Sequence, residues 1–179
     1  MLVIEGGDLV GKTTLCYKLN EHLTTHAYQH LSKLYYDFNP VIGYIDLASR
    51  FSIKDRFHIS EAVYADVTER DTQVTPNSVR LLEAHLRLLG MFTVIVTADD
   101  CLLEERFNQH KAREMYDLET ILRVNERFKI IGSTGRWMGY QFDVDEHIHC
   151  TRNNPWPTTH TSTIAFNYQT RQQILEVHL

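Results

Sequence analysis

The sequence predicts an α/β fold in which helices flank a parallel β-sheet. Short apolar runs alternate along the chain with segments whose apolar residues recur every three or four positions, as in strand–helix–strand units. The run "MFTVIVTA", residues 91–98, is rich in β-branched residues and suits a central strand. The clearest helix covers residues 76–89. Thr75 can cap this helix, Pro76 suits its first turn and Gly90 follows its end.

In the first half of the chain, the expected elements are short and closely spaced. A strand at residues 2–5 leads into a helix that starts at Lys12 and ends near Thr25, because its leucines recur every four residues. The elements expected next are a strand at 30–37, a weakly marked helix at 42–50, a strand at 51–55, and a helix at 60–67 with Ser60 as its N-cap.

The second half of the chain predicts fewer and longer elements. A charged stretch at 104–114 follows the central strand, and apolar spacing then predicts a helix at 117–131 that Gly132 would stop. The last strand is expected within residues 140–150, and a closing helix at 162–177.

Composition limits the classes of protein to which the chain can belong. The 179 residues, 43% hydrophobic and 23% charged, fit one globular domain spanning 1–179. The net charge of −5 offers no overall attraction for nucleic acid or an anionic membrane. The three cysteines have no metal-ligand spacing, and no apolar run approaches the ~20 residues of a membrane span. No signal peptide precedes the first strand, so we expect a cytoplasmic protein, or one in the host cytoplasm if a virus encodes it.

A phosphate-binding motif lies between the first strand and the first helix. Gly6, Gly11, Lys12 and Thr13 complete the pattern GxxxxGKT. Glycines let backbone N–H groups turn towards phosphate oxygens, and the helix N-terminus adds partial positive charge. Lys12 would reach the β- and γ-phosphates of ATP, and the Thr13 hydroxyl would ligate Mg²⁺. The expected nucleotide-binding residues are Gly6, Gly7, Asp8, Leu9, Val10, Gly11, Lys12, Thr13 and Thr14.

This motif alone does not separate an ATPase, a GTPase and a kinase. A GTPase should carry a guanine-reading NKxD sequence, which this chain lacks. An ATP-driven motor should carry an apolar strand that ends in Asp-Glu. The sequence "FDVDE" only imitates that ending, and we interpret Asp145 and Glu146 as an ordinary strand end.

The segment "KDRFHISEAVY", residues 54–64, contains a second group of candidate site residues. Asp55 could hold Mg²⁺ through water or accept a proton, and the guanidinium of Arg56 could bind an acceptor phosphate. Ser60 and Tyr64 would lie on the helix that follows.

With these motifs, the chain resembles the thymidylate kinase branch of the P-loop nucleoside and nucleotide kinases, from Leu2 to about Phe128. The family's EGxDxxGKTT loop matches residues 5–14, and its Asp-Arg pair with a nearby Ser and Tyr matches residues of 54–64. Its arginine-bearing lid corresponds to residues 104–116, with Arg106, Lys111 and Arg113. The resemblance implies a three-layer P-loop NTPase fold with about five parallel strands and a small lid.

The resemblance also implies roles for individual residues. Asp8 would face the sugar of the acceptor rather than the ATP phosphates. The family's Glu-Pro after the second strand is replaced by Asn39-Pro40, which leaves Asp37 as the nearest carboxylate. The implied catalytic residues are Lys12, Asp55, Arg56, Arg106 and Arg113. The implied metal ligands are Thr13 and Asp55. The implied substrate-binding residues are Asp8, Asp37, Phe38, Arg56, Ser60 and Tyr64.

The sequence therefore predicts an ATP- and Mg²⁺-dependent kinase that phosphorylates a (deoxy)nucleoside monophosphate. Loss of the family's glutamate favours this acceptor, since an ionised phosphate needs no general base, unlike a hydroxyl. Two alternatives keep the chemistry: a deoxynucleoside kinase, and a virus-encoded kinase acting on a hydroxymethyl pyrimidine in DNA. A third is a nucleotide-binding module without turnover. The expected partner is a small nucleotide; a nucleic-acid acceptor is not favoured, no membrane is expected, and the resemblance allows a homodimer.

Overall fold

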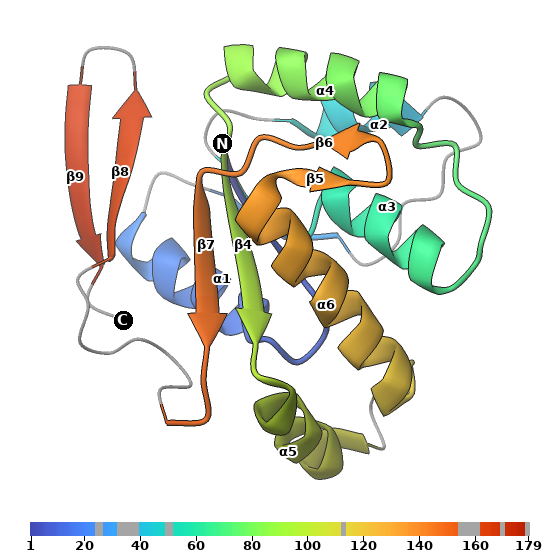
Figure 1. The fold of residues 1–179 in the computed structure, drawn as a ribbon. Coiled ribbons are helices and arrows are strands. Elements are labelled where there is room, and N and C mark those ends of the chain that lie inside the picture. Colours follow the sequence, from blue (N-terminus) through green and yellow to red (C-terminus); the bar gives the residue numbers. More distant parts are fainter. Residues whose placement is uncertain are drawn as a thin grey trace.

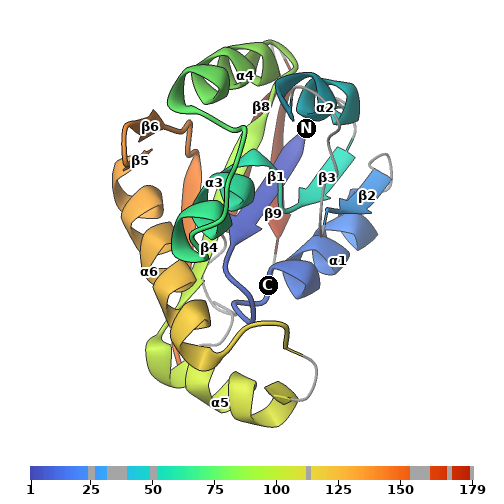
Figure 2. The ribbon, with the colours of Figure 1, turned by 90° about the vertical axis from the view of Figure 1, so that its right-hand side faces the viewer.

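A parallel five-stranded sheet forms the centre of the molecule, with strand order β2-β3-β1-β4-β7. The computed structural model describes residues 1–23, 27–31, 40–48, 52–111, 114–153, 162–168 and 171–177, the last two segments as backbone. The sheet strands are β1 (Leu2–Gly6), β2 (Ala27–His30), β3 (Ser52–Asp55), β4 (Phe92–Ala98) and β7 (Glu146–Cys150). Helices cover both faces, which makes a three-layer α/β fold (Figures 1 and 2).

Alternation along β1 divides the core into two halves. Leu2 and Ile4 face one side, which is covered mainly by α1 (Lys12–His22) and α5 (Asp100–His110). Val3 faces the other side, where the packing helices are α2 (Pro40–Leu47), α3 (His58–Val67), α4 (Pro76–Leu88) and α6 (Leu118–Thr134). Every residue of β1 is buried, as expected for a central parallel strand.

Strand register places the candidate site residues at one edge of the sheet. Ile4 pairs with Asp55 of β3, and Gly6 pairs with Val96 of β4. The carboxyl ends of these parallel strands therefore meet at the same edge. Ligands of open α/β sheets bind at this edge.

Several predicted elements are confirmed, and α4 matches closely. Thr75 and Ser78 form a reciprocal capping box, and Pro76 occupies the first turn. The first helix, the strand at β3 and the central strand β4 also lie where the sequence placed them. The weakly marked helix at 42–50 is α2, although residues 49 and 50 lie outside the described part of the chain.

Three expected boundaries are wrong. Strand β2 spans Ala27–His30 and so begins earlier than predicted, and residues 32–37 lie outside the described part of the chain. Helix α3 starts at His58, so Ser60 is inside the helix and its hydroxyl is used elsewhere. Helix α6 continues through Gly132 and stops at Gly135, which adopts a left-handed conformation with φ of 66°.

Gly132 serves close packing rather than helix termination. A Cβ at this position would lie 2.7 Å from Cγ of His147 on β7. The glycine therefore lets α6 approach the sheet, a tertiary reason that its local sequence does not contain.

The C-terminal prediction of a helix at 162–177 is also wrong. The segment forms an antiparallel hairpin of β8 (Ser162–Tyr168) and β9 (Arg171–Val177). Its Thr, Ile, Phe and Tyr residues favour strands, which outweighed the helical spacing.

Residues 140–150 contain two strands rather than one. Here β6 (Tyr140–Gln141) pairs with β5 (Arg136–Trp137), and β7 follows. Asp145 precedes β7 instead of ending a strand; its carboxylate accepts a 2.7 Å bond from the backbone of Thr93 and pairs with Arg87. Among the described helices, none combines the length and hydropathy needed to cross a bilayer.

Candidate functional site

The glycine-rich loop joins β1 to α1 at the carboxyl edge of the sheet. Gly6 has φ of 151°, and a Cβ there would overlap the backbone oxygen of Val96, so no other residue fits this turn. Gly11 is the N-cap of α1 and gives it no side-chain cap, and the first turn carries no acidic residue. The N-terminal N–H groups of α1 thus remain available to an anion such as phosphate.

A pocket of about 490 Å³ lies over this loop. Its volume is within the usual range for small-molecule sites. The residues that line it come from the loop, β2, the Asp-Arg segment and α5: Asp8, Leu9, Gly11, Lys12, Thr13, Thr14, His30, Arg56, Arg106, Gln109 and His110. The fold therefore brings together residues from three of the sequence segments that were singled out above.

Lys12 is buried at the base of this site. Its ammonium group donates to the backbone oxygen of Gly7. Burial, together with the nearby charge of Arg56, lowers its pKa to about 8, although Asp8 and Asp55 oppose the shift. A phosphate group would compensate for this unfavourable environment.

Three side chains contact the Asp55 carboxylate, and all three meet the same oxygen. Oδ2 accepts from the Thr13 hydroxyl at 2.6 Å and from the Tyr28 hydroxyl at 3.2 Å, and it lies 2.9 Å from Nδ1 of His30. Oδ1 is buried and has no hydrogen-bond partner among the described residues. Burial raises the pKa of this carboxyl, but the charge of Lys12 and the bonds from Thr13 and His30 outweigh burial and lower it.

The residues present fit a Mg²⁺ ion. An ionised carboxylate with a spare oxygen and an adjacent hydroxyl are hard oxygen donors, which Mg²⁺ prefers. No group of three or more His, Cys, Asp and Glu side chains among the described residues could hold a metal alone. A cation here would therefore need further ligands, such as nucleotide phosphates and water.

Asp8 is turned towards the Asp-Arg segment. One carboxylate oxygen pairs with the guanidinium of Arg56, and the other accepts a 2.7 Å bond from the Tyr64 hydroxyl. The Arg56 guanidinium also lies 4.9 Å from the centre of the Tyr64 ring. Arg56 has a left-handed backbone with φ of 69°, and its buried Nε has no partner in the residues that the structure describes. Strain and an unpaired donor in one residue are typical of a binding site.

Glu5 and Ser60 form a buried link behind the loop. The Glu5 carboxylate accepts from the backbone N–H of Ile59 at 2.9 Å, from that of Ser60 at 3.2 Å, and from the Ser60 hydroxyl. Burial raises the pKa of Glu5. Ser60 thus connects α3 to β1, and its predicted part in substrate binding stays a prediction.

The structure describes only part of the predicted lid, residues 104–111 and 114–116. Arg106 lies on α5, and its Nη1 donates a 2.6 Å bond to the backbone oxygen of Leu9. This bond brings the lid segment onto the loop. Lys111 is exposed at the end of α5. Arg113, Asp37 and Phe38 lie outside the described residues.

Sequence reasoning missed Glu5, Tyr28 and His30. An acid inside the apolar run of β1 was a signal for Glu5, since buried acids need partners. Tyr28 and His30 had no comparable signal, because they reach Asp55 only through the pairing of β2 with β3.

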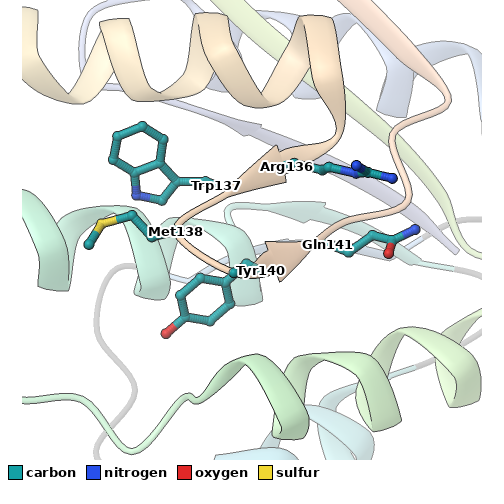
Figure 3. Close-up of a pocket in the computed structure, with 6 residues that line it drawn as sticks. Arg136, Trp137, Met138, Tyr140 and Gln141 are labelled. Atoms are coloured by element: carbon teal, nitrogen blue, oxygen red, sulfur yellow. The ribbon is translucent and has the colours of Figure 1, made fainter.

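A second pocket, of about 360 Å³, is formed by residues 136–141 of the β5–β6 hairpin (Figure 3). Trp137 lies 4.4 Å from the Arg127 guanidinium, and the Tyr140 hydroxyl donates to the backbone oxygen of Val74 at 2.7 Å. Figure 1 places this hairpin at the opposite edge of the sheet from α5. It does not belong to the phosphate-loop site.

Comparison with known proteins supports the fold. No protein-family model and no curated protein matches the sequence. Among solved structures, the chain is similar to the YorR protein of Bacillus subtilis in complex with phosphorylated GDP. The TM-score is 0.63 at 23% identity, over 77% of this chain and 88% of YorR. The fold is P-loop NTPase-like. The parallel five-stranded sheet between two layers of helices, together with this likeness, confirms the predicted fold class. The narrower likeness to thymidylate kinases stays a prediction.

Proposed function

We propose that the protein is a kinase that transfers the γ-phosphoryl group of ATP to a (deoxy)nucleoside monophosphate, with Mg²⁺ as cofactor. One observation carries this proposal. A single pocket gathers Lys12 of the glycine-rich loop, Arg56 of the acceptor segment and Arg106 of α5. Phosphoryl transfer depends on positioning and charge stabilisation, which this group of cations can provide.

The donor half of the site would bind the ATP phosphates. The open N-terminus of α1 and the ammonium of Lys12 supply hydrogen-bond donors and positive charge. Thr13 and Asp55 would hold the cation, and Mg²⁺ would neutralise charge on the β- and γ-phosphates when bound. The nucleotide in the YorR structure supports a nucleotide as the ligand class.

The acceptor half would be formed by Asp8, Arg56 and Tyr64. Arg56 would bind the phosphate of the acceptor, and Asp8 would accept a hydrogen bond from its sugar hydroxyl. Both side chains line the pocket and are already in contact, so one molecule can reach both. Arg106 lies within reach of the same loop and would stabilise the transferred phosphoryl group.

The experiment is coupled detection of ADP release with a panel of acceptors: nucleoside monophosphates, free deoxynucleosides and a hydroxymethylpyrimidine oligonucleotide. We expect turnover with a monophosphate. Lys12→Ala should lower kcat about 10²–10³-fold, a loss typical of removing one transition-state donor. Arg56→Ala should mainly raise the acceptor KM. Arg80→Ala is the matched control, because Arg80 is exposed on α4 and does not line the pocket.

The outcomes separate the alternatives. Transfer only to a hydroxyl acceptor would replace the monophosphate as substrate while leaving the donor half intact. ATP binding in calorimetry, with no transfer to any acceptor, would favour a nucleotide-binding module. Turnover that survives both Lys12→Ala and Arg56→Ala would remove the proposal.

A further inference from the structure

Strand β2 contributes two side chains to the carboxylate that we assign to the cation site. Pairing of β2 with β3 sets Tyr28 beside Ile53 and His30 beside Asp55. Both side chains meet Oδ2 of Asp55, at 3.2 Å from the Tyr28 oxygen and 2.9 Å from His30 Nδ1. Figure 2 shows β2 next to β3 at the end of the sheet near α1. Neither residue belongs to the glycine-rich loop or to the Asp-Arg segment.

The two side chains serve as hydrogen-bond donors to the carboxylate. A carboxylate oxygen accepts hydrogen bonds, so the Nδ1 of His30 carries the hydrogen in this 2.9 Å contact. The Tyr28 hydroxyl donates to the same oxygen at 3.2 Å. The Tyr28 ring is held against Tyr17 of α1, with 5.0 Å between ring centres.

This arrangement constrains Asp55 in an asymmetric way. Within the described part of the chain, three donors, from Thr13, Tyr28 and His30, bind Oδ2, while Oδ1 is buried and has none. A buried carboxylate oxygen without a partner is costly in a folded protein. A divalent cation, or a water molecule in its coordination shell, would satisfy it. The Thr13 hydroxyl can keep its bond to Oδ2 while its lone pair faces the cation.

We propose that Tyr28 and His30 are positioning residues of the cation site, which hold Asp55 so that Oδ1 and the Thr13 hydroxyl serve the cation of a bound nucleotide. The proposal rests on the function proposed above, in which Thr13 and Asp55 hold Mg²⁺. Partners of metal ligands orient those ligands, and their removal commonly weakens metal binding about 10–100-fold.

The placement of His30 argues against a purely structural role. Its side chain is 43% exposed, and it lines the pocket together with Thr13. The backbone hydrogen bonds from Ala27 to His30 already hold β2 on the sheet, so the contact between His30 and Asp55 is not needed for that purpose.

The test measures cation binding directly, without turnover. Mn²⁺ is titrated into protein saturated with a non-hydrolysable ATP analogue, and electron paramagnetic resonance measures the bound Mn²⁺. The affinity for the analogue alone is measured separately in the presence of a metal chelator. The variants are Tyr28→Phe and His30→Ala, with His30→Asn as a conservative change that keeps a donor near Nδ1. Tyr17→Phe is the matched control, since it removes a neighbouring hydroxyl from a ring that is 55% exposed.

We expect Tyr28→Phe and His30→Ala to weaken Mn²⁺ binding about 10–100-fold without changing metal-free analogue binding. His30→Asn should restore most of the affinity, and Tyr17→Phe should match the wild type. Unchanged Mn²⁺ affinity in both variants, or an equal loss of metal-free binding, would overturn this inference alone. A wild-type protein that binds neither analogue nor Mn²⁺ would overturn the proposed function as well.

Discussion

Replacing Glu5 by alanine should destabilise the protein strongly, because this carboxylate is the acceptor for three buried donors. They are the backbone N–H groups of Ile59 and Ser60 and the hydroxyl of Ser60, at the start of α3. Each buried donor left unpaired costs about 1–3 kcal/mol. Burial of the Glu5 carboxyl, which raises its pKa, has a desolvation cost, and the alanine variant no longer bears that cost. We therefore expect a net loss of about 3 kcal/mol in the free energy of unfolding.

The assay is urea denaturation followed by circular dichroism, with linear extrapolation to water. A loss of this size corresponds to a fall in Tm of about 6–12 °C for a chain of this length. Glu5→Gln is the matched control, because its amide oxygen still accepts hydrogen bonds, and it should cost about 1 kcal/mol or less. Ser60→Ala removes only one of the three donors and should also cost about 1 kcal/mol.

The pH dependence gives an independent check. Because the folded state raises the pKa of Glu5 above its ordinary value of 4.5, the folded protein retains this proton to a higher pH than the unfolded chain. The contribution of Glu5 to stability is thus full below pH 4.5 and falls as pH rises through the raised pKa. Glu5→Gln should lack this fall, so the wild type's advantage over it shrinks with rising pH. An alanine variant as stable as wild type, or a glutamine variant as damaged as alanine, would refute this reasoning.

Three further predictions concern other parts of the molecule. ATP affinity should fall as pH rises from 7 to 9, because Lys12 in the nucleotide-free protein loses its proton near pH 8. At pH 9, ATP binding should therefore be accompanied by uptake of a proton. This uptake makes the calorimetric binding enthalpy depend on the buffer, and Lys12→Arg should abolish that dependence. Gly132→Ala should cost about 1–3 kcal/mol in urea denaturation by overpacking against His147, and His147→Ala in the same chain should recover most of it. Asn125→Ala should cost about 2–3 kcal/mol and speed hydrogen exchange at the start of α5, because the buried Asn125 amide bonds both the N–H and the C=O of Ala98.

The sequence predicted those parts of the fold whose signals are local. Helix α4 carries its cap, its first-turn proline and its apolar spacing within its own residues, and β4 is marked by a run of β-branched and mostly apolar residues. The predictions that Ser60 caps α3 and that Gly132 stops α6 were wrong, because neighbours in space decide what these residues do. The Ser60 hydroxyl donates to Glu5, and His147 occupies the space next to Gly132. No pattern within a few residues of either position contains that information.

The candidate site follows the same division. Lys12 and Thr13 were predicted because a phosphate loop requires its residues at fixed spacing within one turn, and the structure places them in one pocket. Tyr28 and His30 could not be predicted, since a one-residue change in the pairing of β2 would turn them away from Asp55. Strand register is a property of the whole sheet.

The pairing of Asp8 with Arg56 has a consequence for selectivity. An arriving molecule does not meet a bare guanidinium, because an internal carboxylate already neutralises it. Free inorganic phosphate could take the carboxylate's place, but it would strand Asp8 with one oxygen still held by Tyr64 and the other unpaired. A ligand that carries both an anionic group and a sugar hydroxyl would give Arg56 and Asp8 new partners at the same time. The internal pair would therefore lower the affinity for small anions relative to such a ligand.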